Sequence, residues 1–523
     1  MTVKLTKTKN MKKILIALTV LLNVSFLMAQ TEFDALKLSK TDITGTARYM
    51  GMAGAFGALG GDASAIKDNP AGLGIYRTSE LVGTMDVMMQ KGNSTWNGVK
   101  SMDDLYKIGF NNFSYVLATP TWRKENGSRG LLSSNFSFSY NRLANFNRSL
   151  NVQSGQAASS ITDYMAYLTN NITSGDLSYT STYEPFDNVN IPWLSVLAYN
   201  GYLMNENVLN GVSSWSSLLG NNETVKPSYV VNEKGYVDEY SLGWAGNFNN
   251  ELFLGTTINF RSLSYTSVSN YGESYSLNRF MNLKDSLYST GTGFNLNIGA
   301  IYSATDNLRL GIAVHSPTIY SISDNYYSTL TYNTVKGGSL STPGGTSNYQ
   351  LQGPLKVNVS AAYIVGNKGL ISAEYDYDKN TGIRLLDENG DSQSFSDENQ
   401  GMSQMLSDVS TIKIGGEYKL TDNFSLRAGY AYSTNATDPN AAKLIRYNTV
   451  RTDAEYYKNN STNYLSAGFG YREANWYIDC AYMNKILDES FYPYNSNNLP
   501  LAVNSAKVIT STNNIVVTLG LKF

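Results

Sequence analysis

The chain has 523 residues, with 40 Lys and Arg against 42 Asp and Glu, and charged residues make up only 16% of it, well below the ~25% usual in soluble domains. A single Cys and a single His exclude an internal disulfide and a Cys/His zinc site, and the near-zero net charge argues against nucleic acid binding. The mean hydropathy of −0.27 is too polar for a helical membrane protein, and the 39 Tyr and 44 Gly indicate many β-strands.

The first 29 residues have the layout of a secretory signal peptide. Lys residues precede an almost uncharged apolar run at 14–28, and Ala29 offers a small residue for cleavage before Gln30. A run of about 15 apolar residues is too short for a membrane-spanning helix, which needs ~20. We therefore expect residues 1–29 to be removed and the mature chain to be exported.

Residues 30–77 are rich in Gly and Ala, show little alternation, and contain the sequence Asn69-Pro70-Ala71-Gly72. Small residues let the backbone pack closely inside a crowded pore, so we interpret this segment as a hatch, or plug, in the lumen of a barrel. Asn69 can cap or bridge backbone groups, Pro70 fixes the chain direction and has no N–H to satisfy, and Gly72 permits a conformation that a Cβ would obstruct.

From residue 78 to residue 523 the sequence alternates repeatedly with a period of two. Leu254, Ile258 and Phe260 share one face, whereas the residues between them are small or polar. A lipid-facing apolar side and a polar lumen require this pattern, so the predicted fold class is all-β, a transmembrane antiparallel β-barrel of about 14 strands. The strands are expected near 79–89, 112–120, 131–142, 236–247, 251–266, 291–303, 308–320, 353–365, 369–380, 409–419, 424–434, 462–471, 476–486 and 511–523.

Short turns alternate with long polar segments along the predicted barrel, as in outer-membrane barrels with periplasmic turns and external loops. The longest external loop is expected at 144–235, where Ala157, Ile161 and Met165 recur at helical spacing. This helix either packs over the barrel mouth or forms a substrate-capture surface, and both interpretations stay open. The other long loops are expected at 267–290, 321–350, 381–408, 435–461 and 487–509.

The last strand carries apolar residues on alternate positions and ends at Phe523. A terminal aromatic residue after such alternation is typical of the signal by which the barrel assembly machinery recognises outer-membrane proteins. We therefore expect Phe523 to act in assembly.

The run from Gly54 to Leu73, which includes Asp62-Ala63-Ser64-Ala65 and Asn69-Pro70-Ala71-Gly72, resembles the hatch signature of the FadL family. These are outer-membrane transporters of long-chain fatty acids and other hydrophobic compounds, and the resemblance covers nearly the whole mature chain. Lys67-Asp68 stands where the family commonly has an aromatic residue. The resemblance implies a protein surrounded by outer-membrane lipid and lipopolysaccharide that takes up a hydrophobic small molecule passively, through a lumenal pocket and a hatch rearrangement.

Arg261, Arg309 and Arg427 are predicted to face the lumen, where they either contact a ligand carboxylate or pair with other barrel charges and with the hatch. Nothing near His315 suggests a catalytic Ser and acid, so we expect no enzyme, no metal site and no cofactor. Two alternative functions stay open: a haem-binding outer-membrane receptor, and a surface adhesion or structural barrel that uses its long loops.

Overall fold

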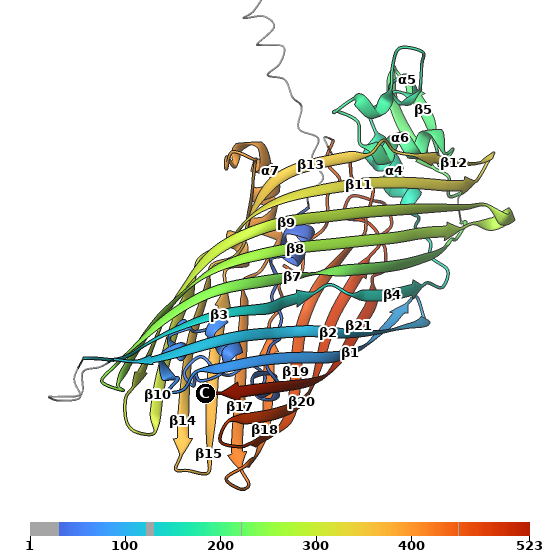
Figure 1. Ribbon diagram of the computed structural model, residues 1–523. Coiled ribbons are helices and arrows are strands. Elements are labelled where there is room, and N and C mark those ends of the chain that lie inside the picture. The colour runs from blue at the N-terminus through green and yellow to red at the C-terminus, as the bar shows by residue number, and fades with distance from the viewer. Residues whose placement is uncertain (1–30, 122–129, 221, 448) are drawn as a thin grey trace, which may run out of the picture.

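The computed structural model describes residues 31–121, 130–220, 222–447 and 449–523. Within these ranges the chain forms a closed antiparallel barrel of 14 strands, which confirms the predicted fold class. Pairing of β1 with β21, from Glu80 opposite Lys522 to Thr95 opposite Lys507, closes the barrel (Figure 1). The predicted signal peptide lies outside the described residues.

The strands are long and steeply tilted, and some wall positions are built from two consecutive segments. The wall contains β1 (Glu80–Trp96), β2 (Val99–Pro120), β3 (Leu131–Asn145) with β4 (Arg148–Gln153), β7 (Lys226–Phe248), β8 (Leu252–Ser274), β9 (Phe280–Ser303), β10 (Leu308–His315) with β11 (Ile319–Asn333), β13 (Gly345–Gln352) with β14 (Lys356–Val365), β15 (Gly369–Asp378), β17 (Val409–Lys419), β18 (Phe424–Ser433), β19 (Tyr456–Arg472), β20 (Trp476–Tyr492) and β21 (Ala506–Lys522). We call its two ends the short-turn end and the long-loop end.

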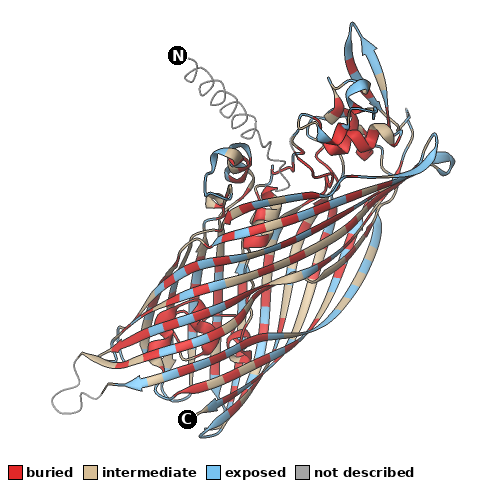
Figure 2. Cartoon of the chain, turned by 45° about the horizontal axis from the view of Figure 1, so that its top comes forward, coloured by how far each residue is buried: buried red, intermediate tan, exposed pale blue. Residues whose placement is uncertain are grey.

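Buried and exposed residues alternate along the strands of the barrel (Figure 2). On β8, Leu254, Ile258 and Phe260 are exposed on the outer face, whereas Thr257 and Asn259 are fully buried inside. The outer face is apolar from the short-turn end up to a row formed by Tyr240, Phe260, Phe294 and Ile319, which lie opposite one another on β7, β8, β9 and β11. Such an apolar band bounded by aromatic residues is the lipid-facing surface of a transmembrane barrel.

The prediction of long polar loops at 267–290 and 321–350 is wrong. These residues mostly continue β8, β9, β11 and β13, joined by the short 3-10 helix η4 (Ser276–Asn278) and by β12 (Gly337–Ser341). Above the apolar band the outer face becomes polar, so hydrophobic alternation disappears from the sequence although the backbone ladder continues. The inner face stays apolar there, with Tyr265, Leu283 and Tyr326 buried.

The predicted external loop at 144–235 is shorter than expected, because β4 and the first part of β7 belong to the wall. Residues 154–220 and 222–225 form a cap at the long-loop end, and its first helix has Ser160 as its N-cap, with a capping box completed by Asp163. The cap contains α4 (Ile161–Thr169), α5 (Ser174–Leu177), η3 (Pro185–Asp187), α6 (Trp193–Asn200), β5 (Met204–Leu209) and β6 (Val212–Ser217). The expected helix therefore exists as α4.

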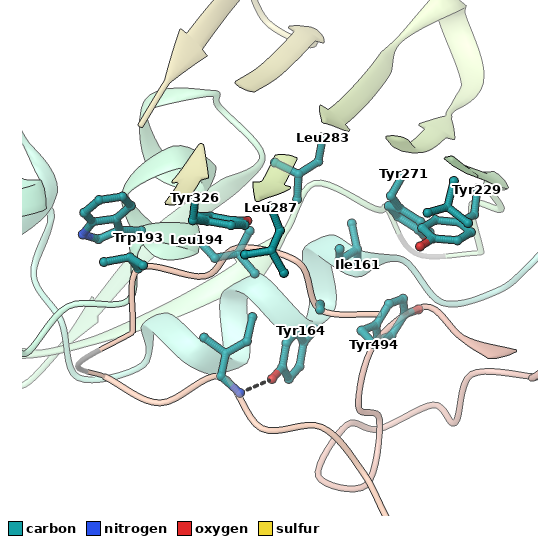
Figure 3. Close-up of a cluster of buried hydrophobic side chains, with 14 of the residues drawn as sticks. Ile161, Tyr164, Trp193, Leu194, Tyr229, Tyr271, Leu283, Leu287, Tyr326 and Tyr494 are labelled. Atoms are coloured by element: carbon teal, nitrogen blue, oxygen red, sulfur yellow. Dashed lines mark hydrogen bonds between the residues drawn. The ribbon is translucent and has the colours of Figure 1, made fainter. Parts of the chain in front are cut away.

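The cap packs into the barrel mouth and forms one hydrophobic core with the inner face of the strands. Ile161 and Tyr164 of α4 lie near Leu287 and Tyr494, and the Tyr164 hydroxyl accepts a hydrogen bond from the backbone N–H of Ile445 at 3.3 Å (Figure 3). Other segments at this end are η5 (Asn380–Gly382), β16 (Arg384–Leu386), η6 (Gln393–Phe395) and α7 (Ser396–Met405).

Residues 31–77, which we call the lumenal segment, run inside the barrel (Figure 1). The segment contains α2 (Glu32–Ser39), α3 (Ala47–Gly51) and two 3-10 helices, η1 (Ala63–Lys67) and η2 (Pro70–Ile75). Its part from α3 onward lies towards the short-turn end, where almost every residue is buried. None of the helices in the described part of the chain is long and apolar enough to cross a bilayer.

Candidate functional site

The lumen contains most of the residues that the sequence singled out. Asn69 immediately precedes η2, and its side-chain nitrogen donates to the carbonyl oxygens of Gly57 at 2.7 Å and Ala300 at 3.2 Å. Its side-chain oxygen accepts from the N–H of Ala71 at 3.1 Å. Pro70 is the first residue of η2, where a missing N–H costs no hydrogen bond. Asn69 thus joins two parts of the lumenal segment to each other and to β9.

Gly72 lies against Gly60 of the same segment. A Cβ on Gly72 would lie 2.9 Å from the Gly60 Cα, and Gly60 itself has a φ of +57°, which favours glycine. The N–H of Gly61 donates to the Gly72 carbonyl oxygen at 3.2 Å. Substitution of either glycine would therefore force apart two backbones that are in direct contact.

Glycines on the inner face of the wall receive the lumenal segment. A Cβ on Gly255 or Gly299 would overlap Pro70 or Asn69, and one on Gly311 would lie 2.7 Å from the Gly57 carbonyl oxygen. Gly415 and Gly429 face Met52 in the same way. The backbone of the segment thus touches the backbone of several strands, so the two surfaces fit without space for side chains.

A chain of buried ion pairs fastens α3 to the wall. Arg48 donates to both carboxylate oxygens of Glu417, at 2.8 and 3.1 Å. Arg427 bonds Glu417 and Asp479, each at 2.6 Å, and its side chain is fully buried. Arg427 is therefore paired with barrel charges, which is one of the two roles expected for it.

A second cluster of buried charged side chains holds the turn that follows α3. Lys413 contacts Glu374 at 2.7 Å and Asp376 at 2.8 Å, and Glu374 accepts from the backbone N–H groups of Phe56 and Gly57 at 3.1 and 2.6 Å. Charge-assisted hydrogen bonds to backbone are stronger than neutral ones. The position of the turn is therefore set by a wall carboxylate.

The other two predicted arginines lie apart from Arg427. Arg261 pairs with Glu239 at 2.9 Å and donates to Thr318 at 2.8 Å, whereas Arg309 donates to the Leu59 carbonyl oxygen at 3.0 Å. Arg309 thus contacts the lumenal segment and Arg261 contacts the wall.

His315 is buried at the end of β10. Its Nε2 lies 2.7 Å from the carbonyl oxygen of Asp68 in the lumenal segment. Among the described residues, no group of three or more His, Cys, Asp or Glu side chains is arranged to hold a metal ion.

Two cavities lie in the lumen on the long-loop side of the segment's packed part. The first, of about 230 Å³, is lined by aromatic rings such as Tyr229 and Tyr265 together with many charged groups. The second, of about 150 Å³, is bordered by Tyr49, Lys67 and His315, so the lumenal segment forms part of its wall. Leu36, Lys40 and Asp42 line both cavities, which therefore adjoin at the end of α2.

Charged groups in this region have shifted pKa values. Burial and the neighbouring Lys485 lower the pKa of Lys40 to about 8. Burial and the nearby carboxylates of Asp453 and Asp285 raise the pKa of Glu455, on the loop before β19, to about 7. The side chains of Lys40 and Glu455 therefore both titrate near neutral pH.

The backbone ladder of the wall is interrupted beside the first cavity, where β4 contacts β1 and β2 through side-chain hydrogen bonds instead. The β2–β3 ladder ends where Asn112 faces Asn141, whereas β2 continues to Val99. Beyond a register shift at Arg142, β3 and then β4 pair with β7. Tyr106 and Ile108, on the part of β2 that pairs with β1 but not with β3, are 68% and 77% exposed. Residues 144–148 of the diverging strand line the first cavity.

Phe523 lies at the short-turn end. Its backbone N–H donates to Ser79 at 3.1 Å and its carbonyl oxygen accepts from Ser79 at 3.2 Å, which ties the chain end to the start of the barrel. Its ring stacks on Tyr115 with centroids 6.1 Å apart.

Sequence reasoning missed the wall glycines and the charged contacts of α2. Asp34 pairs with Arg451 at 3.0 Å and Glu32 pairs with Arg446 at 2.7 Å, far apart in sequence. The glycines did leave a signal, because they occupy lumen-facing positions of otherwise regular strands. The ion pairs of α2 left no such signal in the sequence.

A closed barrel with a lipid-facing apolar band and its own N-terminal region in the lumen defines a class of protein, the transmembrane β-barrels of outer membranes. Sequence comparison gives the family: the profile of the outer membrane protein transport protein family (OMPP1/FadL/TodX) matches residues 217–516, more than half of the chain. The chain belongs to this family, which confirms the resemblance noted in its sequence. It is therefore an outer-membrane transport protein and not an enzyme.

A solved structure shares the fold at low sequence identity. A FadL homologue from Pseudomonas aeruginosa is 12% identical, with 92% of this chain and 99% of that chain covered and a TM-score of 0.54. The toluene transporter TodX from Pseudomonas putida is 13% identical, with 92% and 99% covered and a TM-score of 0.48. No curated protein matches the sequence.

Proposed function

We propose that the protein mediates passive uptake of hydrophobic compounds such as long-chain fatty acids across the outer membrane. The observation that carries the proposal is the arrangement of the lumen, in which two adjoining cavities lie above a closely fitted lumenal segment that borders the second cavity. Family membership supports transport, and the aromatic lining suits an apolar or amphipathic ligand.

The lumenal segment acts as a hatch in this proposal. Polar contacts such as Asn69 to Gly57 and Arg48 to Glu417 hold it, and these groups can exchange partners during a rearrangement. A fatty acid would meet the ammonium group of Lys40 where the two cavities adjoin, and its chain would lie along the aromatic lining of the first cavity.

The test is a double substitution, Asn69→Ala with Pro70→Ala, in purified protein reconstituted into liposomes. We expect normal barrel formation with either reduced uptake of a fluorescent fatty acid, if the hatch guides ligand, or increased leakage of a small polar dye, if it seals the pore. Asn307→Ala, in an exposed short turn, is the matched control. A correctly folded double variant with both fluxes unchanged would contradict the proposed role of the lumenal segment.

A further inference from the structure

Two carboxyl groups from distant parts of the chain lie together beside the first cavity. On the inner face of the wall, Ser269 of β8, Asp285 of β9 and Ser328 of β11 lie opposite one another. The segment before β19 covers this row, since Glu455 accepts from the Ser269 hydroxyl at 2.9 Å and Thr452 donates to Asp285 at 2.6 Å. Asp285 and Glu455, which we call the acidic pair, both line the first cavity.

The basic groups nearest the acidic pair are already bonded to other acids. Lys443 bonds Asp453 at 2.6 Å. Arg451 bonds the same carboxylate at 2.6 Å and also bonds Asp34 at 3.0 Å. Two cations thus balance two carboxylates, and within the described ranges no Lys or Arg forms an ion pair with the acidic pair.

Asp285 has an acceptor that the protein leaves unused. The residue is only 4% exposed, and its Oδ1 atom accepts from the hydroxyls of Tyr326 at 2.7 Å and Thr452 at 2.6 Å. Its Oδ2 atom is buried without a hydrogen-bond partner among the described residues. A buried acceptor without a donor is costly, and more so when it is charged. A ligand that brings N–H donors and a positive charge would satisfy both needs.

Aromatic rings beside the acidic pair suit a cation attached to a hydrocarbon chain. Phe33 of α2 and Tyr456, which follows Glu455, have ring centroids 5.2 Å apart and line the same cavity. An ammonium group is attracted to the face of an aromatic ring, and its hydrocarbon stem packs on the same surface. Lys40 borders both cavities whereas the acidic pair borders only the first, so the two ends of the first cavity differ in charge.

We propose that the acidic pair binds the protonated amine of an amphipathic ligand, so that the lumen accepts long-chain amines in addition to carboxylic acids. This inference rests on the proposed function, because amphipathic compounds must first enter the first cavity.

Binding of an amine is coupled to the proton on Glu455. Burial and the carboxylates of Asp453 and Asp285 raise the pKa of Glu455 to about 7, against the opposing effect of Lys443. An alkylamine, with an ordinary pKa of about 10.4, arrives protonated at pH 7. The incoming charge therefore displaces the proton from Glu455.

The test is isothermal titration calorimetry on purified full-length protein in a neutral detergent. Octylamine, octanol and octanoate are compared as probes of equal chain length, and titrations into detergent alone correct for partition into micelles. At pH 7 we expect octylamine to bind at least tenfold more tightly than octanol. Titrations in buffers of different ionisation enthalpy should show that octylamine binding releases protons.

The Glu455→Gln variant should abolish the proton release and weaken octylamine binding at least threefold. Adding Asp285→Asn should bring the affinity for octylamine down to that for octanol. Asp324→Asn is the matched control, because Asp324 is a buried carboxyl group on β11 that borders neither lumenal cavity. This control should keep the wild-type preference for octylamine.

The proposal is overturned if the wild type binds octylamine no more tightly than octanol, if the preference survives in the double variant, or if Asp324→Asn removes it equally. Octanoate binding without a preference for octylamine overturns the amine site alone, whereas failure of all three probes contradicts the proposed function as well. Heat-modifiable migration verifies folding. If the double variant does not fold, the affinity and proton release of the Glu455→Gln variant decide.

Discussion

The two ends of the lumen are filled in different ways. At the short-turn end, the backbone of the lumenal segment lies directly on wall glycines, and Arg48 and Glu374 fix its position through charged hydrogen bonds. At the long-loop end, large side chains of the cap and strands form a core that leaves two cavities lined with charges. Backbone-on-backbone packing tolerates almost no change in shape, whereas a cavity bordered by flexible side chains can accept a ligand.

In the proposed transport, this contrast places the movement at the short-turn end. We infer that a ligand is held at the long-loop end with small side-chain adjustments and passes the short-turn end when the lumenal segment moves as a unit. The second cavity lies at the boundary, since Tyr49 and Lys67 of the segment border it. The predictions below perturb one end at a time.

The largest effect is expected from Arg427→Ala at the short-turn end. The substitution leaves Asp479 buried without its 2.6 Å partner, and loss of one member of a buried ion pair costs about 3–5 kcal/mol. Barrel unfolding, followed as the heat-dependent shift in gel migration, should occur at a clearly lower temperature. Arg472→Ala is the control, because Arg472 is one-third exposed and 3.8 Å from Asp479, and should shift the transition little. Equal effects of the two substitutions would contradict the importance assigned to the buried pair.

Gly299→Val should displace the lumenal segment at a cost of about 1–3 kcal/mol, because the new side chain overlaps Asn69. We expect faster protease cleavage within residues 52–72 and more leakage of small polar solutes, with the barrel intact. Gly83→Val is the matched control, since a Cβ on this strand glycine meets no atom within 4 Å. If protease cleaves the lumenal segment equally fast in both variants, the close fit to Gly299 does not hold the segment in place.

A smaller, pH-dependent effect is expected at the long-loop end. The pKa of Glu455 is raised from 4.5 to about 7, so the folded chain binds this proton more tightly than the unfolded chain does. The contribution of the protonated Glu455 side chain to stability is complete below pH 4.5 and is lost as the pH rises through 7. Between pH 6 and pH 8 the loop around Glu455 should weaken by about 1 kcal/mol.

Hydrogen exchange of residues 449–456 at the two pH values, corrected for intrinsic rates, measures this change. Glu455→Gln should remove the difference, because the amide does not titrate. A pH difference that persists in the Glu455→Gln variant would assign the effect to another group.

Much of the fold was predictable because lipid imposes a strict pattern on the wall. Alternation such as Leu254, Ile258 and Phe260 identified the membrane-embedded part of the strands. It failed above the apolar band, where Ser264 and Thr266 face water and outer-face hydrophobicity no longer marks a strand. Only the inner face, with residues such as Tyr265, retains a signal there, and that signal alone did not separate strand from loop.

The candidate site was predictable only in part. The Asn69 to Gly72 motif identified the segment inside the lumen, because its residue types suit tight backbone packing. The partners of Arg261, Arg309 and Arg427 were not predictable, since each pairing depends on the register and tilt of strands distant in sequence. The cavities at the end of α2 also depend on tertiary packing, and no local pattern encodes them.

The central claim, that passage requires movement of the lumenal segment, is tested most directly by locking the segment to the wall. Cβ atoms at positions 51 and 481 lie 3.6 Å apart, within the range for a disulfide. The variant carries Gly51→Cys and Ala481→Cys, with Cys480→Ser to remove the native thiol. The control pair, Gly468→Cys with Ala481→Cys in the same background, joins opposed positions of β19 and β20 within the wall.

Uptake of a fluorescent fatty acid into liposomes is measured before and after reduction of each disulfide. We predict that the oxidised 51–481 pair lowers uptake at least tenfold and that reduction restores it, whereas the 468–481 pair has no such effect. Equal uptake by the oxidised and reduced forms of a fully cross-linked 51–481 variant would contradict the claim.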